Sequence, residues 1–212
     1  MMPTSSRQAI LDRIRAATGG DSSNYADLPR NYIHRGPLDN ASRLRLMTER
    51  LREYGAEVVE SSIAELPGTI ARRLQSSGRH VFVAPTGLPA EWLSTGFTWK
   101  VDHQLSHDEI EHCDGVVTAS FAGVADSGTI ILHHSPAEGR RVLTLLPDFH
   151  LCILRASQIV ETLPEYFARC PQPPRLATYV SGPSATADIE MTRIKGVHGP
   201  RFLSVIIVRD DD

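Results

Sequence analysis

Two continuous apolar runs constrain the fold of this 212-residue chain more than any other feature of its sequence. They are Val81-Phe82-Val83-Ala84 and Val205-Ile206-Ile207-Val208, and each has the length of a β-strand. A strand without polar alternation is buried on both faces, which is typical of a largely parallel sheet covered by helices. The sequence therefore predicts a sheet whose two faces are both covered by other layers.

Strand-like and helical segments alternate along the chain after residue 55. The expected strands cover residues 56–59, 80–84, 115–119, 128–133, 141–146, 150–154, 176–181 and 202–208. The expected helices cover residues 61–76, 89–95, 106–112, 156–169 and 185–194. This interleaving predicts an α/β protein with three α/β/α layers and a mixed, largely parallel sheet. Consecutive strands between residues 115 and 154 indicate an antiparallel excursion.

The first 54 residues are predicted to form a helical arm packed on an α/β domain of residues 55–212. One helix is expected over residues 5–17, where apolar side chains recur on one face. A second helix is expected to begin after Asp39, which can cap it, and to end at Gly55. The segment between the two helices is expected to be an extended connector.

Composition excludes several classes of protein. No apolar run approaches the ~18 residues of a membrane span, and the N-terminus lacks a signal-peptide core. We therefore expect a cytoplasmic protein with no membrane span. The 22 basic and 25 acidic residues give a net charge of −3, which argues against a nucleic-acid partner. The three cysteines cannot form a four-cysteine cluster site, so no metal or cofactor is expected in this chain.

The segment from residue 176 to 190 is predicted to form a strand, a loop and the start of a helix. Its glycine allows the backbone to approach a ligand, its hydroxyl side chains can cap the helix, and the first-turn amides point outward. This arrangement can bind a carboxylate or a phosphate, although an ordinary capped connection needs the same residues. The candidate anion-binding residues here are Ser181, Gly182, Ser184, Thr186 and Asp188.

A second loop, residues 196–201, precedes the last apolar strand. Its two glycines and its proline predict a tight turn with His198 and Arg201 at the rim. These side chains can handle a proton and a carboxylate, or they can simply hold the turn in place. Because this loop and residues 181–184 flank the same expected helix, we expect the two loops to lie close together.

The third candidate is the segment Ala125-Asp126-Ser127-Gly128-Thr129-Ile130, which feeds an apolar strand. A hairpin turn explains this composition. The functional interpretation places the Asp126 carboxylate at the mouth of a site, where it can act as a general base. Asp126 and His198 are thus the candidate catalytic residues. The further candidates for binding a substrate or an anion are Ser127, Gly128, Thr129 and Arg201.

Five segments in this order resemble the LUD domain family, named for lactate utilisation, and in particular its lactate utilisation protein C type. The resemblance covers about residues 80–208, and it implies a fold related to the sugar-phosphate isomerase and CoA-transferase superfold. The segments that carry it are residues 125–130, Leu145-Leu146-Pro147-Asp148 with His150, Gln158-Ile159-Val160, residues 181–190 and Gly196-Val197-His198-Gly199-Pro200.

The resemblance also implies a role in the oxidation of L-lactate to pyruvate beside iron–sulfur partner proteins. Since this chain lacks the ligands for a cluster, we expect those partners to carry the electrons and this chain not to be redox-competent by itself. It would then be an accessory subunit that binds a small organic acid or an anionic cofactor group. Two alternatives stay open: an independent enzyme acting on a phosphorylated or CoA-linked metabolite, and a structural or regulatory partner without catalysis.

Overall fold

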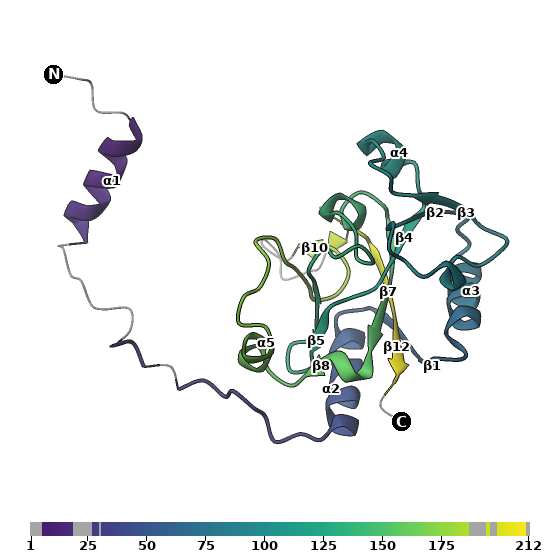
Figure 1. Cartoon of the computed structure of the whole chain (residues 1–212), viewed down its shortest axis with the longest axis horizontal. Coiled ribbons are helices and arrows are strands. Elements are labelled where there is room, and N and C mark those ends of the chain that lie inside the picture. Colours follow the sequence, from purple (N-terminus) through teal and green to yellow (C-terminus); the bar gives the residue numbers. More distant parts are fainter. Residues whose placement is uncertain (1–5, 19–26, 30, 187–193, 196–198, 211–212) are drawn as a thin grey trace. The chain divides into compact units, whose positions relative to one another are not determined.

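The computed structural model describes residues 6–18, 27–29, 31–186, 194–195 and 199–210 (Figure 1). The chain divides into two units, Met1–Tyr32 and Ile33–Asp212. The smaller unit contains the predicted first helix, α1 (Ser6–Ala17), which has no buried residue. The division predicted at residue 54 lies inside the larger unit.

The larger unit is built on a parallel sheet, and the two apolar runs of the sequence form β2 and the second half of β12 within it. Residues 205–208 are buried, as a strand covered on both faces requires. Each neighbouring pair of strands in this sheet is parallel. In the described part of the chain its order is β1 (Glu57–Ser62), β12 (Phe202–Arg209), β7 (Phe149–Arg155), β4 (Gly115–Thr118), β2 (Val81–Ala84) and β3 (Thr98–Val101).

Helices cover both faces of this sheet, as the sequence predicts. On one face, α3 (Leu66–Ser76) and the 3₁₀ turn η2 (Ala90–Trp92) pack against the side of the sheet that carries Phe82 and Ile206. On the other face lies α2 (Asn40–Glu53), so that α2 and α3 flank β12 in Figure 1. Met47 and Leu51 of α2 are fully buried against this second face. The predicted second helix is therefore part of the core of the larger unit.

A second sheet shares the layer that contains α2. The described residues give it the order β8 (Ile159–Val160), β5 (Ala122–Val124), β6 (Thr129–Leu132) and β9 (Thr178–Val180). β5 and β6 form an antiparallel hairpin, β9 extends it antiparallel to β6, and β8 is parallel to β5. The antiparallel excursion predicted from the sequence is thus a separate sheet. The helix α5 (Leu163–Arg169) packs on it through the buried Tyr166.

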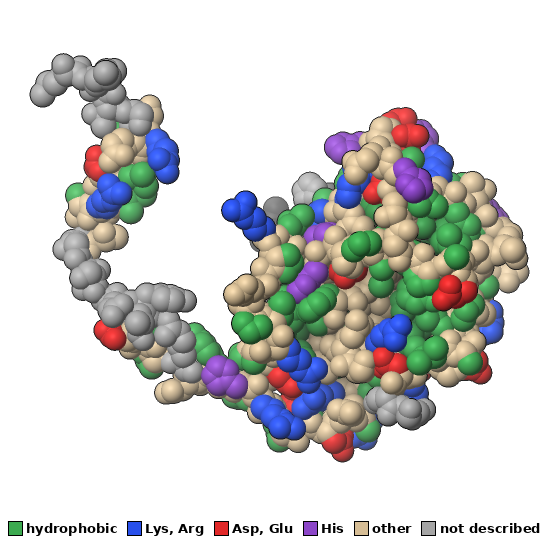
Figure 2. All heavy atoms as spheres, viewed as in Figure 1, with side chains coloured by type: hydrophobic (Ala, Val, Ile, Leu, Met, Phe, Trp, Pro, Cys, Tyr) green, Lys and Arg blue, Asp and Glu red, His purple; other side chains and the backbone are tan. Residues whose placement is uncertain are grey.

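Charged side chains mark the parts of this unit that face solvent. Figure 2 shows acidic and histidine side chains gathered over α4 (His107–Glu111). Only Ile110 of that helix is buried, and it packs with Leu143 of the 3₁₀ turn η3 (Arg141–Thr144). Among the described residues, none of the helices combines the length and the apolar composition that crossing a membrane requires.

Two predicted elements differ in the structure. Residues 141–146 were expected to be a strand, but they begin with η3, because Leu143 and Leu145 bond back to Arg140 and Val142 in the pattern of a 3₁₀ turn. The expected helix 156–169 is interrupted by β8. Its Ile159-Val160 pair is β-branched and adds to the edge of β5 before α5 begins.

The helix expected over residues 185–194 is also wrong at both of its ends. Ala185–Thr186 forms β10, and Ile194–Lys195 forms β11, which pairs with it antiparallel. The threonine and the isoleucine that pair here are β-branched residues, which favour a strand over a helix. The chain therefore leaves residue 184 as a strand. Residues 187–193 lie outside the described part of the chain.

Candidate active site

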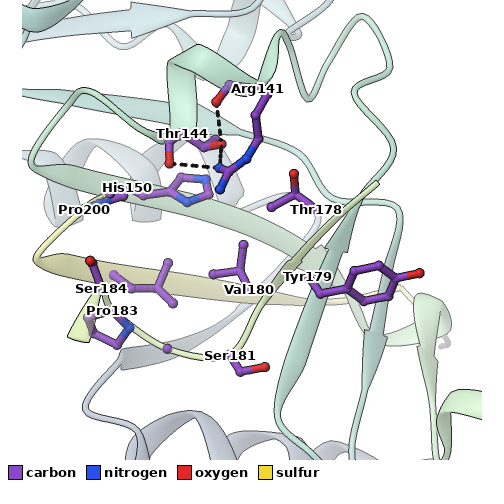
Figure 3. Close-up of a pocket in the computed structure, with 13 residues that line it drawn as sticks. Arg141, Thr144, His150, Thr178, Tyr179, Val180, Ser181, Pro183, Ser184 and Pro200 are labelled. Carbon is purple, nitrogen blue, oxygen red and sulfur yellow. Dashed lines mark hydrogen bonds between the residues drawn. The ribbon is translucent and has the colours of Figure 1, made fainter. Parts of the chain in front are cut away.

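A cavity of about 150 Å³ lies where η3, β7 and β9 meet the loops at residues 181–184 and 199–200 (Figure 3). The backbone N–H of Ser184 donates to the carbonyl of Pro200 over 2.8 Å, so the two loops are in direct contact. The closeness predicted for them is confirmed for these residues. The polar side chains that line the cavity are those of Arg141, Thr144, His150, Thr178, Ser181 and Ser184.

Arg141 gives this cavity its positive charge. Its Nη1 donates to the Oγ1 of Thr144 over 2.9 Å and to the carbonyl of the same residue over 3.3 Å. It forms no ion pair with any carboxylate among the residues that the structure describes. Burial lowers the pKa of the guanidinium, although an arginine stays charged at neutral pH. A half-buried cation whose partners are all neutral is a place where an anion binds favourably.

His150 lies beside Arg141 and is only 2% exposed. Burial and the neighbouring guanidinium lower its pKa to about 4, so the imidazole is uncharged at neutral pH. Its Nε2 is 2.8 Å from the Oγ1 of Thr118, which fixes the plane of the ring. Among the described residues that line the cavity, Arg141 is therefore the one that is charged at neutral pH. The imidazole contributes only a hydrogen-bonding group.

A chain of hydroxyl groups joins the β5–β6 hairpin to this cavity. The Oγ of Ser127 is 2.8 Å from the Oγ1 of Thr129, which is 2.7 Å from the Oγ of Ser181. The turn between them needs Gly128, whose φ is 60° and whose backbone packs directly against Arg50. The structure thus brings two of the three predicted segments together through Thr129 and Ser181.

Asp126 lies outside the lining of the cavity. Its side chain is exposed, and its backbone is held by Glu161, whose carbonyl accepts from the Asp126 N–H over 3.0 Å, and by Arg50. Arg201 also points elsewhere, because its guanidinium is ion-paired with Asp148. This ion pair agrees with the alternative in which Arg201 holds the turn in place, and the role of Arg201 stays a prediction.

Three other predicted site residues fall at the edge of what the structure describes. Thr186 pairs through its backbone in β10, while Asp188 and His198 lie outside the described residues. Gly182 lines the cavity, but a Cβ added to it would clash with Tyr54, the residue that caps the C-terminus of α2. The helix that was expected to supply first-turn amides after residue 184 is wrong there, since Ala185–Thr186 forms a strand, whereas anion binding by this loop stays a prediction. The roles of the predicted site residues stay predictions.

Arg141 and His150 are the site residues that the sequence analysis missed. His150 belongs to one of the five segments that resemble the LUD domain family, and that resemblance was a signal for it. Nothing comparable marks Arg141, which follows another arginine at the start of an expected strand. That it has no carboxylate partner among the described residues is a property of the packed structure. Among the described residues, no three His, Cys, Asp or Glu side chains gather as a metal site.

Comparison with known proteins places the whole α/β unit in one family. The family model of the LUD domain matches residues 44–208. The chain belongs to the LUD domain family. It is 44% identical to lactate utilization protein C of Deinococcus radiodurans over 176 residues, which cover 81% of this chain and 82% of that protein. The family resemblance drawn from the five sequence segments is confirmed, since all five lie within the LUD domain.

Two further comparisons support the same family assignment. Lactate utilization protein C of Bacillus licheniformis is 27% identical over 222 residues, covering 94% of this chain and 92% of that protein. A crystal structure of a DUF162 family protein from Deinococcus radiodurans superposes with a TM-score of 0.67 at 38% identity, and covers 81% of this chain and 99% of that one. The predicted α/β class and the largely parallel sheet of this LUD domain are confirmed.

Proposed function

We propose that this chain serves lactate utilisation in the cytoplasm as a subunit that binds a small organic carboxylate at Arg141. The name lactate utilization protein C, which several relatives carry, supports the pathway. The observation that carries the binding role is the guanidinium of Arg141, which faces a small cavity and has only neutral partners among the described residues. A cavity of about 150 Å³ suits an acid of a few carbon atoms.

The cavity can hold both ends of an α-hydroxy or α-keto acid. The remaining N–H groups of Arg141 can donate to the two carboxylate oxygens. The hydroxyl groups of Thr178 and Ser181 line the same cavity and can hydrogen-bond to the oxygen on the neighbouring carbon. The uncharged ring of His150 adds no second positive charge, so binding depends on a single cation.

Oxidation of L-lactate to pyruvate releases two electrons and two protons, which an acceptor has to take up. With three cysteines, this chain cannot provide a four-cysteine iron–sulfur site. We therefore assign the electron-carrying role to iron–sulfur partner proteins, and to this chain the binding and orientation of the acid.

Replacing Arg141 with methionine is expected to weaken the binding of L-lactate and pyruvate by about 10- to 100-fold, because a charge-assisted hydrogen-bonded pair contributes roughly 1.5–3 kcal/mol. Isothermal titration calorimetry at neutral pH measures the effect. Arg45→Met is the matched control, because Arg45 is exposed on α2 and donates to Ser42 of the same helix. Lactamide, which lacks the charge, should bind neither protein. Equal affinities of the Arg141 variant and the wild type for pyruvate would contradict the proposal.

The pathway role has a separate test. We expect this chain to co-purify with its iron–sulfur partners, and lactate oxidation by the reconstituted mixture to require all components. The Arg141→Met protein should assemble with the partners but support less oxidation at low lactate concentration, since only acid binding is changed. Full lactate oxidation by the partners alone would rule out the proposed subunit role.

A further inference from the structure

A second and larger cavity, of about 710 Å³, adjoins the first one at Arg141, which lines both. Its walls come from the loop after β2, the loop after β3 and the segment from His134 to Arg141. The partition between the two cavities includes a hydrogen bond of 2.8 Å between the Nε2 of His134 and the Oγ1 of Thr178. None of the predicted site residues that the structure describes lines this second cavity.

The position of the second cavity in the fold is one where α/β proteins bind ligands. β2 and β3 are parallel neighbours, and the residues that follow their carboxyl ends, including Thr86 and Gln104, form the cavity wall. Ligands in open parallel sheets bind beyond these strand ends. The volume falls within the range of roughly 300–1,000 Å³ that is usual for cofactor-sized ligands.

Backbone strain is concentrated at this cavity. Among the described residues, Gln104 and His134 are the two non-glycine residues with left-handed backbone, with φ values of 68° and 59°, and both line the cavity. The surrounding structure holds the strained backbone at His134, because its Nδ1 contacts the carbonyl of Gly139 over 2.8 Å. Strain of this kind is retained most often at functional sites.

The charges around the cavity leave one cation for a ligand. Asp102 is 7% exposed and accepts from the Nε of Arg140 over 2.8 Å, which pairs these two charges with each other. Arg141 has no such partner among the described residues, so the cavity keeps a net positive charge. Apolar surface lies at the rim, where Pro136 is exposed and Leu176 is 53% exposed.

We propose that this second cavity binds a nucleoside phosphate, with the phosphate at Arg141 and the base against Pro136 and Leu176. The hydroxyl of Thr86 and the amide of Gln104 lie on the same wall and can bond to the hydroxyl groups of the sugar. The proposal goes beyond the acid-binding role, because it concerns a different ligand in a different cavity. The two sites share only the guanidinium of Arg141.

The test uses ADP as the probe and calorimetry on the full chain. Wild-type protein is expected to bind ADP more tightly than adenosine, since adenosine lacks the phosphate. Thr86→Trp places a large ring in the cavity from an exposed rim position and should weaken ADP binding at least about tenfold, while lactate binding stays unchanged. Thr98→Trp, at an exposed position on β3, is the matched control and should bind ADP like the wild type.

A second variant keeps the test valid if Thr86→Trp does not fold. Leu176→Glu replaces the exposed apolar side chain against which the base is proposed to lie, and should also weaken ADP binding, because the base loses its apolar contact. Absence of ADP binding to the wild type up to tens of millimolar, or equal ADP affinities of the wild type and Thr86→Trp, would overturn the nucleotide proposal. Neither result bears on lactate binding, which the Arg141 experiment tests separately.

Discussion

Replacing Gly182 with alanine is expected to lower the free energy of unfolding by about 3 kcal/mol. The φ of Gly182 is 95°, a backbone conformation that L-amino acids with a side chain rarely adopt. A Cβ added there would also lie 2.6 Å from the Cβ of Tyr54, which follows the last residue of α2, so the loop or the end of the helix would have to move. Urea denaturation followed by circular dichroism measures the loss.

Gly55→Ala separates the two causes. Gly55 has a similar φ of 86°, but a Cβ added there meets no atom within 4 Å. It should therefore cost only the conformational penalty, about 1 kcal/mol. If both variants lose the same stability, the contact with Tyr54 is not the reason that position 182 requires glycine. In that case Gly182→Ala would have only the smaller folding defect, and its effect on ligand binding could be measured directly.

Gly182 shows what the sequence can and cannot predict at this site. The sequence predicted that a glycine here allows the backbone to approach a ligand, whereas the close neighbour in the structure is a residue of the protein itself. That neighbour is Tyr54, which is distant in sequence and comes close only because α2 packs beside β12. The requirement for glycine is thus at least partly structural. Side-chain periodicity carries no information about such tertiary neighbours.

The fold was more predictable than the site, because its main signal is local. The apolar runs that form β2 and the second half of β12 are buried on both faces in any sheet that helices cover, so their sequence alone indicates their place. The predictions of secondary structure failed where the pairing of strands in the folded protein decides the outcome. Thr186 and Ile194 pair across a hairpin, although the spacing of the residues around them also permits a helix.

The chemistry of the site was the least predictable part. The loops at residues 184 and 200 were expected to meet, and they do. The residue that gives the cavity its charge is nevertheless Arg141, which no motif singled out. An arginine binds a ligand or a carboxylate of its own protein with the same geometry. Arg140 pairs with Asp102 while its neighbour Arg141 does not, and only the packed structure distinguishes the two.

Lowering the pH from 7 to about 4.5 is expected to destabilise the protein by about 2 kcal/mol through His150. The folded state holds the pKa of His150 at about 4, below its ordinary value of 6.5. Between these values the unfolded chain takes up a proton that the native protein does not. Stability is therefore complete above pH 6.5 and falls as the pH is lowered towards 4. Urea denaturation at several pH values measures the slope.

His150→Gln isolates this contribution, because glutamine can still bond to Thr118 but does not titrate in this range. The variant should be less stable than the wild type at pH 7, where it loses packing, and should approach or exceed it near pH 4.5. His103→Gln changes an exposed histidine and should keep the wild-type slope. Burial also lowers the pKa of His133, so a smaller slope of the same sign remains in every variant.

The carboxyl groups whose pKa is lowered in the folded protein contribute mainly below this window, although Glu109, with an ordinary pKa of 4.5, begins to contribute at its acidic end. The pKa of Asp102 is lowered below its ordinary value of 3.8, mainly by its hydrogen bond from Arg140. The ion pair therefore contributes its full stability above pH 3.8 and loses it only when the pH falls further. A wild-type slope that His150→Gln leaves unchanged between pH 6.5 and 4.5 would show that His150 accepts a proton in the native state. The cavity would then carry a second positive charge beside Arg141, and its preference for anions would increase as the pH falls.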